Sequence, residues 1–98
     1  KEWVILAFHI PLASDNFSKA VKAAAARNPR VILALAGHRH SNACEEIDLG
    51  SRKLLQVRTA SLALNPSSYR RFRLHADRIE IFDPGETNTI TRTLELIQ

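Results

Sequence analysis

Three of the four histidines in this 98-residue chain follow apolar runs, and this placement suggests metal chemistry. His9 comes directly after the run at residues 3–8, and His38 and His40 follow the run at residues 31–36. Imidazole is the commonest metal-ligating side chain in proteins. Because ligands bind at the carboxyl ends of parallel strands, two neighbouring strands of this kind would present all three imidazoles at one edge. We therefore predict metal ligands at His9, His38 and His40.

Three other residues with reactive or charged side chains have simpler interpretations. Arg39 lies between two of the histidines, and it either contacts a substrate phosphate through its guanidinium group or is a solvated loop residue. His75 lies in a later segment and is expected at the surface. Cys44 precedes Glu45 and Glu46, whose negative charges disfavour a reactive thiolate. Arg39 is therefore the candidate substrate-binding residue, and no residue is assigned as a general acid or base.

The apolar runs before the histidines predict the elements that position them. Residues 3–8 and 31–36 are continuously apolar, which is typical of strands buried on both faces of a parallel sheet. A helical pattern lies between them, with Ser14 or Asp15 as its N-cap. Residues 1–37 therefore predict a βαβ unit with a right-handed crossover. The apolar stripe of the helix consists of Phe17, Ala20, Val21, Ala24 and Ala25.

The rest of the chain predicts short strands. Residues 38–82 contain the loop with the histidine motif and then four segments with partial alternation, separated by turn residues. This pattern predicts an antiparallel β meander, in which Arg70, Arg71 and Arg73 are more typical of the outward faces of a strand than of a nucleic-acid patch. Residues 83–98 form a C-terminal tail or one added strand. The four segments are residues 43–49, 53–60, 69–75 and 79–82.

Composition limits the classes of protein that this chain can represent. Its 45% hydrophobic and 24% charged residues are typical of a folded globular domain, and 98 residues supply one core only. The formal net charge of +4 makes anionic partners plausible but does not by itself imply nucleic acid. The single cysteine fits a reducing compartment, and we expect a cytoplasmic protein. No apolar run reaches the ~20 residues of a membrane span, so no membrane partner is expected.

The positions of the histidine motifs resemble those of a known family. A His9-Ile10-Pro11 segment after a strand, a helix, and a second strand ending in Gly37-His38-Arg39-His40 together resemble the C-terminal half of the calcineurin-like metallophosphoesterases. The resemblance covers roughly residues 3–82 and continues into Ser61-Leu62 and Pro66-Ser67-Ser68-Tyr69-Arg70, which is similar to bacterial phosphodiesterases of that superfamily. It implies an α/β fold: a βαβ unit and a β meander that make up the C-terminal half of a four-layer αββα sandwich.

The resemblance also implies a function and a cofactor. His9 and His38 match histidines of the family's second metal site, and His40 matches the histidine of its first. The intact domain would use two divalent ions (Mn, Fe or Zn) for hydrolysis of a phosphodiester by an activated hydroxide. The other family motifs, Asp-x-His, Gly-Asp-x-x-Asp and Gly-Asn-His, do not occur in this chain. It therefore lacks the bridging aspartate, and we expect a partial domain that binds one metal ion or none and is inactive alone.

Two other functions remain open at this point. The chain is either the C-terminal part of such a hydrolase, a non-catalytic basic module that binds nucleic acid or another anion, or a structural fragment that self-associates. Salt dependence of binding would identify the second, since released counterions set its slope. If the first interpretation is right, exposed apolar sheet faces should lead to a homo-oligomer or to pairing with the N-terminal half of the same domain.

Overall fold

The computed structural model describes residues 2–37, 42–59, 69–85 and 88–96, and these contain one helix and seven strands. Most of the expected elements are confirmed with closely matching bounds. The strand expected over residues 69–75 is the main exception, because it covers three residues only. The elements are β1 (Val4–Phe8), α1 (Asn16–Ala26), β2 (Val31–Ala36), β3 (Ala43–Asp48), β4 (Lys53–Arg58), β5 (Phe72–Leu74), β6 (Arg78–Phe82) and β7 (Ile90–Glu95).

The first three elements form the expected βαβ unit. β1 and β2 are parallel neighbours, and α1 connects them. The helix begins after Asp15, whose backbone is extended, and ends before Pro29, because proline disfavours helical geometry in the residue that precedes it. The predicted apolar stripe of α1 is only partly correct. Ala25 of that stripe is buried, but Phe17 is 61% exposed, and the helix also buries Ser18, which the stripe did not include.

The larger sheet has the strand order β1-β2-β4-β3, which corrects the predicted meander. β4 lies beside β2 and runs parallel to it, and β3 forms an antiparallel hairpin with β4 at the edge. The physical reason is burial: four consecutive residues of β4, from Leu54 to Val57, are buried, as in a central strand with both faces covered. Gly50, with φ of +93°, lies in the left-handed region at the hairpin turn.

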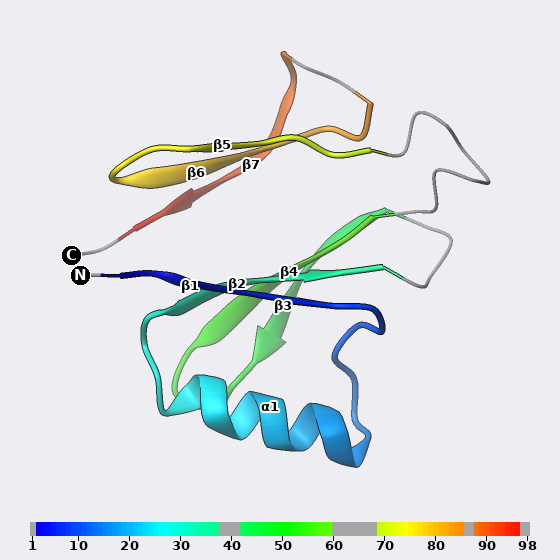
Figure 1. Ribbon diagram of the computed structural model, residues 1–98, viewed down its shortest axis with the longest axis vertical. Helices are drawn as coiled ribbons and strands as arrows, with labels where there is room; N and C mark the ends of the chain where they lie inside the picture. Colours follow the sequence, from blue (N-terminus) through cyan, green and yellow to red (C-terminus); the bar gives the residue numbers. More distant parts are fainter. Residues whose placement is uncertain (1, 38–41, 60–68, 86–87, 97–98) are drawn as a thin grey trace.

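The smaller sheet is antiparallel, with the order β5-β6-β7. The C-terminal segment therefore supplies an added strand, β7, which was one of the two outcomes expected for residues 83–98. Figure 1 shows α1, the larger sheet and the smaller sheet as successive layers. The fold is thus mixed α and β, with mostly strands and two stacked sheets.

Two apolar clusters hold these layers together. One lies between α1 and the larger sheet, and the other lies between the two sheets. β2 contributes to both because successive side chains of a strand point to opposite faces of the sheet, so Ala34 faces α1 while Leu33 faces the smaller sheet. The first cluster is built on Leu12, Ala25, Val31, Ala34 and Leu54. The second is built on Leu33, Leu55, Val57, Ile79 and Ile81.

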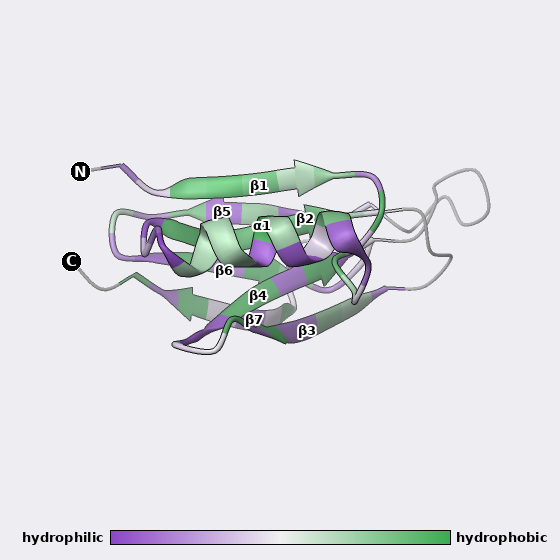
Figure 2. Ribbon diagram, turned by 90° about the horizontal axis from the view of Figure 1, so that it is seen from below, coloured by the Kyte–Doolittle hydropathy of each residue, from purple (hydrophilic) through white to green (hydrophobic). Residues whose placement is uncertain are grey.

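The predicted burial of β1 on both faces is wrong for this chain. β1 is the edge strand of the larger sheet, and Val4 and Ile5 are 36% and 39% exposed. Figure 2 shows this apolar strand along the border of the layers. Its sequence is that of an interior strand, yet among the described residues only β2 pairs with it. No helix in the described ranges is both long and apolar enough to span a bilayer.

Candidate functional site

The carboxyl ends of the three parallel strands lie side by side. The Gly37 amide, just after β2, donates a 2.9 Å hydrogen bond to the carbonyl oxygen of His9, just after β1. The Thr59 amide, just after β4, donates a 3.1 Å hydrogen bond to the carbonyl oxygen of Ala36. His9 is therefore next to the residue that precedes His38 in the chain. The expected convergence of the two strand ends is present in the backbone.

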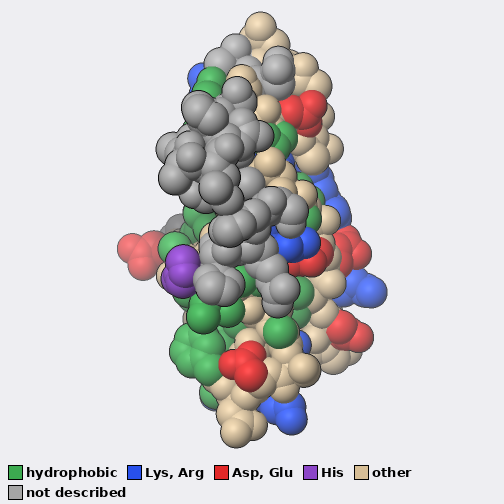
Figure 3. All heavy atoms as spheres, turned by 90° about the vertical axis from the view of Figure 1, so that its right-hand side faces the viewer, with side chains coloured by type: hydrophobic (Ala, Val, Ile, Leu, Met, Phe, Trp, Pro, Cys, Tyr) green, Lys and Arg blue, Asp and Glu red, His purple; other side chains and the backbone are tan. Residues whose placement is uncertain are grey.

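Of the predicted site residues, the structure describes His9 only. His38, Arg39 and His40 lie outside the described residues, so their side chains are not placed. His9 is exposed and lines a cavity at the end of β1. Figure 3 views this side of the molecule, where hydrophobic side chains gather beside a histidine. Within the described ranges, histidine, cysteine, aspartate and glutamate side chains form no group of three that is suited to a metal ion.

Two carboxylates, Asp15 beside His9 in the cavity wall and Glu45 on β3, already have partners. Asp15 accepts a hydrogen bond from the Ser18 hydroxyl, and this bond lowers the pKa of its carboxyl group. Glu45 forms an ion pair with Arg58 at 2.9 Å. It also accepts a 3.1 Å hydrogen bond from the Gln56 side-chain amide. Both acids therefore serve local structure, and a metal ion here would depend on imidazole nitrogens for its protein ligands.

Gln56 is a positioning residue that the sequence analysis missed. It lies on β4 and is fully buried, with an exposed fraction of 0%. Its Oε1 accepts a 2.8 Å hydrogen bond from the Leu12 amide, while its Nε2 donates to Glu45. The backbone that follows His9 is therefore anchored to the middle of the larger sheet. The available signal was a glutamine within a buried apolar strand, because buried polar groups normally have specific partners.

Arg70 also differs from its expected outward position. Its guanidinium group is partly buried and donates to the Phe82 carbonyl oxygen at 3.2 Å and to the Cys44 sulfur at 3.7 Å. Since Cys44 belongs to β3 and Phe82 to β6, this arginine links the two sheets. Arg71 and Arg73 lie over the ring of Phe82, at 4.8 and 5.3 Å from its centroid. These contacts give all three arginines structural roles.

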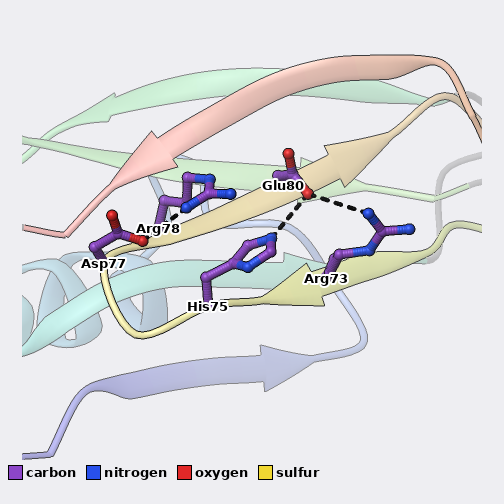
Figure 4. Close-up of polar contacts among 5 residues, drawn as sticks. All are labelled: Arg73, His75, Asp77, Arg78 and Glu80. Carbon is purple, nitrogen blue, oxygen red and sulfur yellow. Dashed lines mark hydrogen bonds and ion pairs between the residues drawn. The ribbon is translucent and has the colours of Figure 1, made fainter.

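His75, expected as a plain surface residue, is part of a polar cluster on the smaller sheet. Its Nε2 lies 2.9 Å from Glu80 Oε1, which also faces Arg73 at 3.7 Å. Figure 4 shows Glu80 between these two side chains, with the Arg78–Asp77 pair beside them. The hydrogen bond from His75 is the main cause of the lowered pKa of Glu80. This cluster stabilises the β5–β6 hairpin rather than forming a site with His9.

Many of the basic side chains are paired within the fold. Arg52, for example, donates from Nη2 to the carbonyl oxygens of Ala25 and Asn28 after the end of α1. Such pairing gives these side chains roles within the fold. The acid–base pairs are Arg58–Glu45, Arg73–Glu80, Arg78–Asp77 and Arg92–Glu46.

Comparisons of the chain with protein-family models, with curated proteins and with solved structures found no match.

Proposed function

We propose that the chain is the C-terminal part of a calcineurin-like metallophosphoesterase, in which His9, His38 and His40 ligate divalent metal. The observation that carries this proposal is the 2.9 Å hydrogen bond between the Gly37 amide and the His9 carbonyl oxygen. It supports a shared site because His38 directly follows Gly37. The parallel βαβ unit adds support, since ligands of such sheets bind outside the carboxyl ends of the strands.

The donor set fits one metal ion better than two. Three imidazoles are sufficient ligands for a single zinc ion. They carry no charge to offset the repulsion between two dications about 4 Å apart, and Asp15 and Glu45 already have partners. We therefore propose that this chain alone binds one ion and that the pair of Mn, Fe or Zn ions belongs to the intact domain.

The proposed reaction is hydrolysis of a phosphodiester. Bound divalent ions supply Lewis acidity and lower the pKa of a bound water to about 7. In this reaction the histidines of this chain ligate the metal ion. The guanidinium group of Arg39 pairs with a phosphate oxygen of the substrate through its N–H donors. Gln56 fixes the backbone after His9 and so limits the positions that the imidazole can take.

Zinc titration calorimetry on the chain and on single variants tests the metal site. His9→Ala, His38→Ala and His40→Ala should each lower zinc affinity at least about tenfold, since even the loss of an outer-shell partner costs about 10–100-fold. The matched control is His75→Gln, which keeps a hydrogen-bond donor for Glu80 and should leave zinc affinity unchanged. Equal zinc affinity in the three site variants and the control would contradict the proposal.

The coding sequence gives an independent test of the hydrolase assignment. The reading frame upstream of Lys1 should encode Asp-x-His, Gly-Asp-x-x-Asp and Gly-Asn-His motifs, whose side chains would complete the dimetal site. The longer protein should then hydrolyse bis(p-nitrophenyl) phosphate in a manganese-dependent manner, and the chain described here should not. A start codon directly before Lys1 would refute the assignment.

The edge of β1 supports the expected self-association or pairing with the N-terminal half of the same domain. Val4 and Ile5 are exposed on a strand that carries no charged residue, so nothing in the strand opposes a further β-strand. Light scattering during size-exclusion chromatography should show dimers or larger species at concentrations near 1 mM, on the order expected for a weak association. A strictly monomeric chain at that concentration would refute self-association.

A further inference from the structure

A cavity of about 370 Å³ lies beside His9, between the end of β1 and the first turn of α1. Apolar side chains form most of its wall: Phe8, Ile10, Pro11 and Phe17. His9 is part of the same wall, so the cavity opens next to the strand ends described above. It therefore lies beside one of the three proposed metal ligands.

The apolar wall is not part of the core of the protein. Ile10 is 57% exposed and Phe17 is 61% exposed, although both are large hydrophobic residues. Phe17 belongs to the apolar stripe of α1, yet the helix packs on the larger sheet through other residues. Adjacent exposed apolar side chains around a cavity are typical of a ligand site. Their placement indicates a ligand with an apolar part.

The polar part of the wall excludes an anion from the cavity itself. The Ser18 hydroxyl donates to Asp15 and accepts a 2.9 Å hydrogen bond from the Ala13 amide, so it is already used. The bond from Ser18 favours the ionised form of Asp15, whose negative charge repels phosphate. A phosphoester would therefore leave its phosphate on the His9 side and insert its uncharged ester group.

We propose that this cavity binds the aromatic ester group of a phosphodiester whose phosphate lies at the strand ends beside His9. The proposal rests on the proposed function and adds its substrate class. An apolar cavity of about 150 Å³ is enough to bind benzene, so a cavity of about 370 Å³ accommodates an aryl or nucleobase ring. Phe17 supplies a ring for stacking or edge-to-face contact.

Calorimetry with two phosphodiesters of equal charge tests this proposal. Diphenyl phosphate should bind the zinc-loaded chain up to about tenfold more tightly than dimethyl phosphate, since an aromatic contact is worth up to about one power of ten in affinity. Phe17→Ala should remove most of this preference. Leu74→Ala is the matched control, because Leu74 is similarly exposed, at 67%, but lies on β5.

A neutral probe separates this proposal from the metal site. In the presence of EDTA, phenol should still bind the chain, and Phe17→Ala should weaken its binding while Leu74→Ala should not. Equal affinities for diphenyl and dimethyl phosphate in the zinc-loaded chain would overturn the aromatic subsite and leave the metal site standing. Loss of zinc binding in His9→Ala would support the proposed function whichever phosphodiester binds better.

Discussion

Replacement of Gln56 by methionine should destabilise the protein and loosen the backbone after His9. Methionine matches the length of glutamine but cannot accept the 2.8 Å hydrogen bond from the Leu12 amide. Leu12 is only 5% exposed, so its N–H would stay buried without a partner, which costs about 1–3 kcal/mol. The bond to Glu45 adds little, because Glu45 keeps its ion pair with Arg58. We expect a loss of about 2 kcal/mol in the free energy of unfolding.

Urea unfolding followed by circular dichroism measures this loss, and amide hydrogen exchange locates it. A loss of about 2 kcal/mol corresponds to a fall of about 8–16 °C in the melting temperature of a domain of this size. The Leu12 amide should exchange much faster in Gln56→Met. The control is Lys53→Met on the same strand, where the exposed lysine should be replaceable within about 0.5 kcal/mol. Unchanged protection of the Leu12 amide, or a loss equal to that of the control, would refute the anchoring role.

Three further predictions concern the core, the hairpin turn and the polar cluster. Ile81→Ala should cost about 2–5 kcal/mol in urea unfolding, since Ile81 is fully buried between the sheets; a smaller loss would contradict that packing. Gly50→Ala should cost about 1–2 kcal/mol in the same assay, because its φ is +93°, and no loss would argue against the left-handed turn. Since the bond from His75 lowers the pKa of Glu80, the stability that it provides is present above the ordinary value of 4.5 and is lost as pH falls through the lowered pKa. Glu80→Gln should therefore lose less stability than the parent chain in that acidic window, and equal losses would contradict the prediction.

The sequence predicted the local elements well because their signals are local. The continuous apolar runs and the helical pattern between them identified β1, α1 and β2, and a parallel pairing followed from the short connections. The same reasoning failed for β4. Partial alternation predicts a meander, whereas four consecutive buried residues place β4 between β2 and β3. The pairing that decides the topology joins β2 and β4, which are separated in the sequence by β3. A pairing between such distant segments is not visible in the local pattern of residues.

The candidate site was predictable to a similar degree. A histidine after an apolar run could be assigned to a strand end, and the His9–Gly37 backbone contact agrees with that assignment. The roles of Gln56 and Arg70 could not be predicted, because each depends on a partner far away in the chain. The exposure of Phe17 could not be predicted from the sequence either, because helical spacing alone does not determine which side of an apolar stripe faces the sheet.

The position of β4 beside β2 determines how the connection after His9 is held. By lying beside β2, β4 brings Gln56 under the connection from β1 to α1, where it binds the Leu12 amide. One residue later, the Ala13 amide donates to the Ser18 hydroxyl, and the Ala13 carbonyl oxygen accepts from Lys22. The connection after His9 is therefore fixed by the sheet on one side and by the helix on the other. Because sites held by such supporting bonds lose little freedom when a ligand binds, a change at Gln56 should weaken ligand binding at His9 without touching the ligand.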